Sequence, residues 1–285
     1  MTIHHIRRSF AVAACMLSVL AACSASAQEP GEDRNPFEGL NVRQGPGILR
    51  LGSIAEVRLP GECIYLNGTD TSRLMKRLGN PSEGGELGSV AGDSCIAIFE
   101  FDPVGYVKDD EKDELDPDEL LDSIREGTKE ANKERARMGA APMYIKGWYR
   151  KPYYDEATHN LEWIITGESE GVENLNVNTR ILGRKGVMTV TLVTSPETIA
   201  QDLPVYREWL KGFDFRAGQK YGEYRSGDKV AEYGLMALVA GGGAAALAKG
   251  GFFKSFWKLI VAGLAAAGAL IKNSSGRRSP DVRGG

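Results

Sequence analysis

The stretch LNVNTRILGRKGVMTVTLVT, residues 175–194, decides the fold of this chain. Both of its halves follow the alternation of apolar and polar side chains that is typical of a β-strand. The halves, 175–182 and 187–194, are separated by GRKG at Gly183 to Gly186, which favours a tight hairpin turn. The sequence therefore predicts two antiparallel strands.

Two more runs of period two, 143–149 and 161–166, precede this hairpin, so we expect four strands in an antiparallel meander. After them, Ser195-Pro196-Glu197 begins a helix. Pro204 lies within this helix and should kink or restart it. The apolar positions that keep helical spacing are Ile199, Leu203, Tyr206, Leu210 and Phe213.

The N-terminal half adds strands at 55–59, 63–66 and 94–101, with a short helix at 71–78 that Gly79 ends. The order strand, helix, strand predicts that 63–66 and 94–101 are parallel neighbours. The predicted fold class is α+β: a mostly antiparallel sheet with a few packed helices, plus a C-terminal membrane segment.

An acid-rich stretch, GYVKDDEKDELDPDELL at 105–121, admits three interpretations: a cation-binding loop, a catalytic acid cluster or the start of a helix. A calcium loop of the EF-hand type would need Gly where Glu114 stands and Glu where Leu120 stands. By contrast, Asp-Pro-Asp-Glu from Asp116 provides a capping acid, Pro at the first helical position and Glu three residues after the cap. We therefore interpret the stretch as the start of a helix over 117–138.

The N-terminus predicts an export signal, because His and Arg residues lead into a short apolar run and Ala25-Ser26-Ala27 provides small residues before the cut. We expect residues 1–27 to be removed. A second cleavage stays open at Leu-Ala-Ala-Cys, which would leave a lipidated Cys23. Residues 28–47, rich in Gly, Pro and charge, are predicted to be a linker to an exported domain over 48–216.

The C-terminal region predicts a juxtamembrane segment at 217–232 and a membrane anchor at 233–272. Its apolar runs, 234–248 and 259–271, are each shorter than the roughly 20 residues that a span needs. Two arrangements stay open: one span over 252–271, or a helical hairpin of two short segments.

We favour one span with the basic tail, 273–285, in the cytoplasm. Together with the export signal, this places the main domain in the periplasm of a bacterium, anchored to the inner membrane. Small residues at Ala240, Ala244 and Ala248 let helices approach closely in lipid, and they predict a homo-oligomer.

Of the four cysteines, Cys15 and Cys23 lie in the signal region, which leaves Cys63 and Cys95 in an oxidising compartment. Each of the latter two begins an apolar strand. If these strands are parallel neighbours, their spacing allows a disulfide between Cys63 and Cys95. The alternative is two buried thiols.

The formal net charge of −3, which becomes −5 once Arg7 and Arg8 leave with the signal, disfavours nucleic acid as a partner. His159 is the one histidine after the signal, so a zinc site built from His and Cys lacks ligands, and we expect no metal and no cofactor. His159 falls in a predicted hairpin connection, which indicates a solvated rather than a catalytic side chain.

Charged and aromatic residues in turns and at strand ends form the candidate surface for a ligand or partner. The alternative is that Trp148 and Tyr154 pack in the fold, that Asp155 caps its turn and that the arginines pair with carboxylates. The candidate residues are Lys108, Asp109, Asp110, Trp148, Tyr154, Asp155, Arg180 and Arg184.

Five motifs of this sequence occur in the order of a known family. They are GN at 79–80, GYVKDD at 105–110, GWYRKPYYDEATHNLEW at 147–163, NVNTRILGRKGV at 176–187 and GDKVAEYGL at 227–235. With these motifs the chain resembles the bacterial membrane-anchored proteins of domain-of-unknown-function family 2167. The resemblance implies an exported domain with a C-terminal anchor, and it implies no activity.

Two functions stay open. The first is a non-enzymatic envelope protein whose exported domain binds a protein partner or a cell-wall component while the C-terminus anchors it in the membrane. The second is a membrane-tethered hydrolase that uses Asp109, Asp110 or Asp155 as acid and base.

Overall fold

The computed structural model of the protein describes residues 35–78, 80, 84–137 and 139–240. The chain divides into two units, Met1–Asn35 and Pro36–Gly285, and the fold below is that of the second unit. The predicted export signal, 1–27, and the predicted span, 252–271, both lie outside the described residues.

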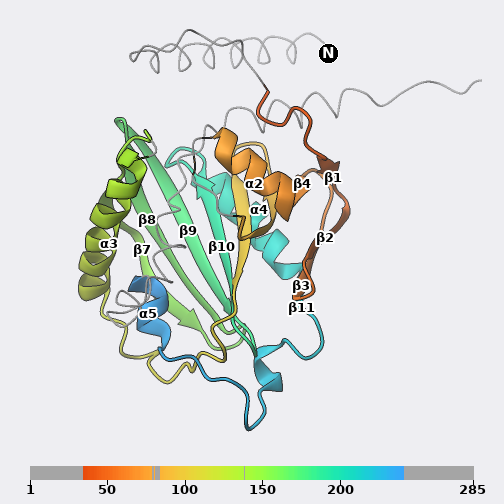
Figure 1. Ribbon diagram of the computed structural model, residues 1–285, viewed down its shortest axis with the longest axis vertical. Coiled ribbons are helices and arrows are strands. Elements are labelled where there is room, and N and C mark those ends of the chain that lie inside the picture. Colours follow the sequence, from red (N-terminus) through yellow and green to blue (C-terminus); the bar gives the residue numbers. More distant parts are fainter. Residues whose placement is uncertain (1–34, 79, 81–83, 138, 241–285) are drawn as a thin grey trace, which may run out of the picture. The chain divides into compact units, whose positions relative to one another are not determined.

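An eight-stranded sheet forms the centre of the fold, and every neighbouring pair in it is antiparallel (Figure 1). Its strands, in spatial order, are β1 (Arg43–Gln44), β4 (Ile64–Asn67), β5 (Glu86–Ala91), β6 (Ile96–Asp102), β10 (Val187–Thr194), β9 (Val172–Leu182), β8 (Asn160–Ser169) and β7 (Tyr144–Asp155). A separate sheet of three antiparallel strands contains β11 (Phe213–Phe215), β3 (Ala55–Leu59) and β2 (Gly47–Leu51).

The hairpin of β9 and β10 is confirmed: β9 ends at Leu182 and β10 begins at Val187, as the sequence predicts. The Gly183 N–H donates to the Gly186 carbonyl across a distance of 2.9 Å, which closes the turn. The four strands from β7 to β10 form the predicted meander, and the α+β class with a large antiparallel sheet is confirmed.

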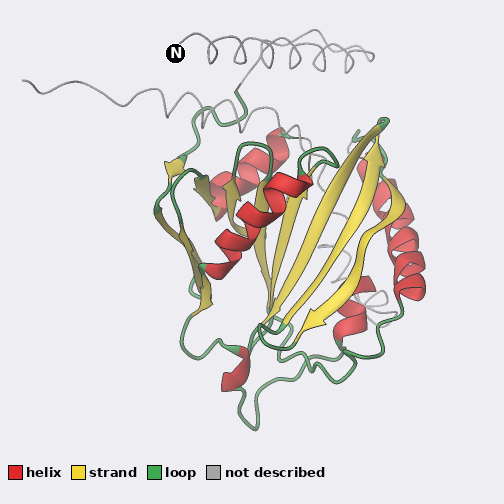
Figure 2. Cartoon of the chain, turned by 180° about the vertical axis from the view of Figure 1, so that it is seen from behind, coloured by secondary structure: helices red, strands yellow, loops and turns green. Residues whose placement is uncertain are grey.

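Both faces of the large sheet are covered, and we call them the front face, on the side of Trp163, and the rear face, on the side of Ile164. On the front face lie α3 (Pro117–Arg137), α5 (Leu235–Ala240) and α2 (Gly68–Arg77) (Figure 1). On the rear face lie α4 (Ile199–Lys211) and the small sheet (Figure 2). The helix α4 continues through Pro204 as one helix, so the predicted restart at this proline does not occur.

One predicted strand pairing is wrong. Strands β4 and β6 are not neighbours, because β5 lies between them and pairs with both. Ile64 and Ile96 are each opposite Ala91, so these two residues are about 10 Å apart, or two strand spacings.

The predicted disulfide is wrong for the same reason. Cys63 and Cys95 directly precede Ile64 and Ile96, and both are free, buried thiols in the rear-face core. A disulfide needs Cα atoms within about 7 Å, which the intervening strand prevents. Burial raises the pKa of Cys63 to about 11. Burial, together with the nearby carboxylate of Asp202, raises the pKa of Cys95 further.

The boundaries of the domain are wider than predicted. Residues 36–47, expected in the linker, contain β1 and the buried Phe37, and the Arg77 guanidinium donates to the carbonyls of Pro36 and Glu38 at 2.8 and 2.7 Å.

At the other end, Tyr221 of the predicted juxtamembrane segment is buried in the front-face core. So are Leu235, Leu238 and Val239 of the predicted anchor. Within the described residues, no helix is long and apolar enough to cross a membrane.

Because Cys63 and Cys95 are free, alkylation of the denatured, unreduced protein should label both of them. In the folded protein both should resist the reagent, since burial disfavours the reactive thiolate. Mass spectrometry of the two cysteine-containing peptides measures the labelling. A denatured protein in which both peptides stay unlabelled until a reductant is added would contradict the structure.

Candidate functional site

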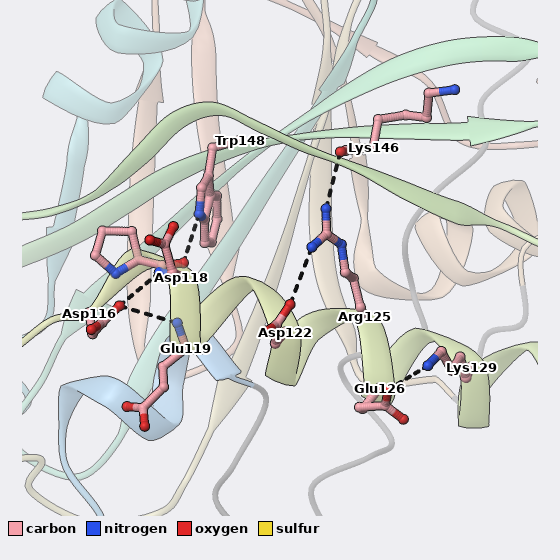
Figure 3. Close-up of polar contacts among 10 residues, drawn as sticks. Asp116, Asp118, Glu119, Asp122, Arg125, Glu126, Lys129, Lys146 and Trp148 are labelled. Carbon is pink, nitrogen blue, oxygen red and sulfur yellow. Dashed lines mark hydrogen bonds and ion pairs between the residues drawn. The ribbon is translucent and has the colours of Figure 1, made fainter.

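The acid-rich stretch begins a helix, as predicted. The Asp116 carboxylate accepts hydrogen bonds from the N–H groups of Asp118 and Glu119 at 2.9 and 3.2 Å, and thereby caps the start of α3 (Figure 3). The indole N–H of Trp148 donates to the Pro117 carbonyl at 2.9 Å, which ties the capped end to β7. The interpretation as a helix start is confirmed.

Two more residues of this stretch, Glu111 and Lys112, make contacts within the fold. The Glu111 carboxylate accepts from the N–H of Met236 at 3.3 Å, at the start of α5. Lys112 forms an ion pair with Glu156 at 2.7 Å, in the turn between β7 and β8. Among the described residues, no group of three or more His, Cys, Asp and Glu could hold a metal ion.

Asp109, Tyr154 and His159 form a hydrogen-bonded chain at the end of β7. The Tyr154 hydroxyl donates to the Asp109 carboxylate at 2.9 Å and lies 3.1 Å from Nδ1 of His159. Because the phenol has one proton, and Asp109 accepts it, Nδ1 of His159 is the donor in the second bond. The His159 ring packs on Tyr221 with centroids 4.4 Å apart, and Tyr221 stacks on Tyr106.

This chain of contacts does not activate the Tyr154 hydroxyl as a nucleophile. Burial and the adjacent Asp109 raise the pKa of Tyr154 far above its ordinary value, so the phenolate is disfavoured. The Asp155 carboxylate accepts from the N–H of Ala157 at 2.9 Å and caps its turn. Of the three acids considered for a hydrolase, Asp109 and Asp155 are thus bonded within the fold, while Asp110 is exposed.

The remaining candidate residues do not come together at one site. Arg184 pairs with Asp228 through two bonds of 2.7 and 2.8 Å, and the pKa of Asp228 falls to about 2 because of this partner. Arg180 is buried on the front face, with its guanidinium 4.8 Å from the centre of the Trp163 ring. Lys108 is exposed. Most of the candidate residues therefore occupy the structural roles of the alternative interpretation.

A pocket that the sequence did not indicate lies on the rear face, between α4 and β7. Its volume is about 430 Å³. Its walls are mixed, with apolar and charged side chains from α4 and one aromatic and one basic side chain from β7. The lining residues are Tyr149, Arg150, Ile199, Ala200, Leu203, Pro204, Arg207, Glu208 and Lys211. We call this pocket the α4–β7 groove.

A β-bulge turns Arg150 into this groove. Opposite residues of an antiparallel pair share a face, and Trp148 lies opposite Ile165, on the front face. Arg150 lies opposite Ile164, on the rear face, because Tyr149 is an extra residue between these two pairs. Without the bulge, Arg150 would share the front face with Trp148 and would be absent from the groove.

A buried carboxylate holds the basic side chains of the groove in place. Glu162 of β8 is 5% exposed, and one of its oxygens accepts from Arg150 at 3.1 Å and from Arg207 at 3.0 Å. The hydroxyl of Tyr153 donates to the same oxygen at 3.3 Å. A second bulge, between Arg150 and Tyr153, places both residues on the rear face, opposite Ile164 and Glu162 respectively.

Two guanidinium groups therefore face one carboxylate, and Lys211 pairs with Glu208 nearby. One positive charge is left in excess in the groove. The side chains of Arg150 and Arg207 are 38% and 45% exposed, so their remaining N–H groups are accessible to a ligand.

Pro204 removes one regular helical hydrogen bond beside the same groove. It has no N–H, so the carbonyl of Ala200, one turn earlier in α4, lacks the donor that a regular helix provides. Both residues line the groove. Sequence reasoning could have used this proline inside a helix, and the basic and aromatic run YRKPYY at 149–154, as signals of a site.

Comparisons with known proteins place the chain in one family. The model of the family described as "Protein of unknown function (DUF2167)" matches residues 43–271, so the chain belongs to this family, and the resemblance of the five motifs is confirmed. No curated protein matches the chain at a significant level.

The solved structures that are similar to the chain include the following two. One is the solution structure of cyanobacterial PsbP (CyanoP) from Synechocystis sp. PCC 6803, with a TM-score of 0.35, 11% identity, and coverage of 68% of this chain and 99% of that one. The other is the apo structure of the immunity protein TplEi of T6SS from Pseudomonas aeruginosa, with a TM-score of 0.26, 7% identity, and coverage of 72% and 84%.

Replacing the cap residue of α3 tests the structural interpretation of the acid-rich stretch. Asp116→Ala should lower the free energy of unfolding by about 1 kcal/mol, because two N–H groups lose their acceptor. Asp110→Ala, at an exposed acid of the same stretch, is the matched control and should change it by less than about 0.5 kcal/mol. Equilibrium unfolding in urea measures both. Equal effects of the two substitutions would show that Asp116 does not cap the helix.

Proposed function

We propose that this member of the DUF2167 family is a membrane-anchored bacterial envelope protein whose exported domain, residues 36–240, binds a protein partner in the α4–β7 groove. The observation that carries the proposal is the pair of partly exposed arginines, Arg150 and Arg207, fixed on the buried carboxylate of Glu162. Side chains held in this way on strand and helix are preorganised for binding. The acids considered for a hydrolase offer no comparable arrangement, so we propose binding rather than catalysis.

The proposed anchor is a single span over 252–271. The rival hairpin would require residues 234–248 to form its first membrane segment. However, Leu235, Leu238 and Val239 are buried in the front-face core of the domain, together with Ile124 of α3. These residues therefore pack within the folded domain, which leaves them unavailable for a membrane segment and favours the single span.

The export signal and one span together give the proposed topology. The signal at 1–27 directs the domain across the inner membrane, and the span stops transfer. The basic tail, 273–285, is then cytoplasmic, in line with the preference for positive charge on that side. The predicted homo-oligomer stays a prediction, although Ala240, the first residue of its small-residue stripe, packs in the front-face core.

Truncation tests the anchor and the place where the domain ends. A chain that ends at Ala240 should leave the membrane fraction and stay folded. A chain that ends at Glu232 should lose stability, because each buried apolar side chain of α5 contributes about 1.5–3 kcal/mol. Carbonate extraction and thermal unfolding are the measurements. Full-length protein that carbonate releases would refute the anchor, and equal stability of the two truncated chains would refute the boundary.

Photocrosslinking in intact cells tests the groove as the binding site. A photoreactive amino acid at Tyr149, in the groove and 53% exposed, should give a discrete adduct with one protein. The matched control is Tyr144, which lies on the same strand, is 57% exposed and is outside the groove lining. The adduct should disappear when Arg150 and Arg207 are both replaced by Gln. The same adduct from both positions would argue against binding in the groove.

A further inference from the structure

We infer that the α4–β7 groove recognises a peptide carboxylate that lies next to an apolar side chain, as in an acidic or C-terminal segment of a partner protein. This inference rests on the proposed binding function and adds the chemistry of the ligand. It follows from three features of the groove: an excess of positive charge, an apolar wall and a backbone carbonyl that lacks its regular helical donor.

Two arginines provide the positive charge of the groove. Arg150 and Arg207 donate one N–H each to Glu162, so each guanidinium keeps further donors for a second acceptor. The planar guanidinium matches a carboxylate with two parallel bonds. Both arginines already converge on one carboxylate oxygen of Glu162, at 3.1 and 3.0 Å. A second carboxylate, from the ligand, would balance the remaining charge.

The apolar wall comes from α4. Ile199, Leu203 and Pro204 line the groove on this side, and the ring of Tyr149 lies on the other. An apolar side chain of the ligand would displace water from these surfaces. The volume of about 430 Å³ lies toward the lower end of the range of about 300–1,000 Å³ typical of small-ligand sites, which suits a short segment rather than a long one.

The Ala200 carbonyl distinguishes a peptide from a simple anion. Because Pro204 cannot donate to it, this carbonyl can accept an N–H from the ligand. A peptide supplies a carboxylate, an N–H and an apolar side chain within one residue. Inorganic phosphate supplies only the anion.

The groove, rather than the free edge of β7, carries the recognition. β7 is the outermost of the described strands of the large sheet, next to β8 alone. Its pairing with β8 shifts register at three places, and Pro152 removes one N–H from the strand. Bulges and proline are devices that keep an edge strand from pairing with another chain. A partner is therefore held by side chains in the groove.

Fluorine NMR of a small probe tests this inference on the full chain in detergent micelles. The probe is N-acetyl-para-fluorophenylalanine, which carries the carboxylate, the N–H and the apolar ring. Its line should broaden saturably in the presence of the protein, compared with micelles alone. The C-terminal amide of the same compound should bind about tenfold or more weakly, because it lacks the charge. Equal binding of acid and amide would overturn the inference.

Variants locate the binding. Arg207→Gln should lower the affinity for the probe by about tenfold or more, whereas Arg125→Gln should leave this affinity unchanged. Arg125 is a matched control, since it is similarly exposed, pairs with Asp122 and lies on α3 of the front face. Unchanged probe binding in Arg207→Gln would overturn the inference. Because loss of Arg207 leaves Glu162 with fewer donors, near-ultraviolet circular dichroism checks that the variant is folded.

A competition experiment distinguishes a site for a peptide carboxylate from a site for any small anion. Inorganic phosphate should displace the probe only at much higher concentration than unlabelled N-acetylphenylalanine does. Displacement at equal concentrations would mean a general anion site and would overturn the peptide assignment. If the Tyr149 adduct forms in cells while acid and amide probes behave alike, this inference fails and the proposed function stands. If neither the adduct nor probe binding is seen, both fail.

Discussion

The pairing of β6 with β10 is the constraint on which the rest of the structure depends. It joins Ile96–Asp102 to Val187–Thr194, two segments separated by α3 and three strands in the sequence. Through this pairing, the N-terminal strands β4 to β6 and the C-terminal meander β7 to β10 become one sheet. The register is fixed over seven consecutive residue pairs, so the sheet has two continuous faces, and each face needs a cover of helices or strands.

The bulges of β7 create the candidate site on this otherwise regular sheet. A strand that alternated strictly would have placed Arg150 beneath α3, far from Arg207, and Glu162 would have been buried with fewer donors. One extra residue in β7 moves Arg150 to the rear face. The Glu162 carboxylate then holds the guanidinium groups of Arg150 and Arg207, which are far apart in the sequence. The acid-rich stretch acts differently, because Asp116 caps α3 and Asp109 accepts from the Tyr154 hydroxyl, so both carboxylates serve stability.

Local patterns predicted the elements that depend on local chemistry. The hairpin at 175–194 and the helix after Asp116 were correct, since turn residues and a cap determine them. β5 was missed because Gly88 and Ser89 interrupt its short apolar pattern, and the false neighbours β4 and β6 followed from that. Residues 235–240 were assigned to the membrane because a helix buried in a core is as apolar as a span. The groove was missed because it depends on register shifts, which no single segment of the sequence displays.

The burial of α5 also sets a limit on distance. If the span begins at Phe252, the chain between it and Ala240 contains only residues 241–251, which reach at most about 40 Å when fully extended. In the proposed topology, the domain would then sample a thin layer above the bilayer rather than the full depth of the periplasm. If the proposed partner is held in the same membrane, it would be met at a raised effective concentration, and a groove of modest intrinsic affinity would then suffice for lasting association.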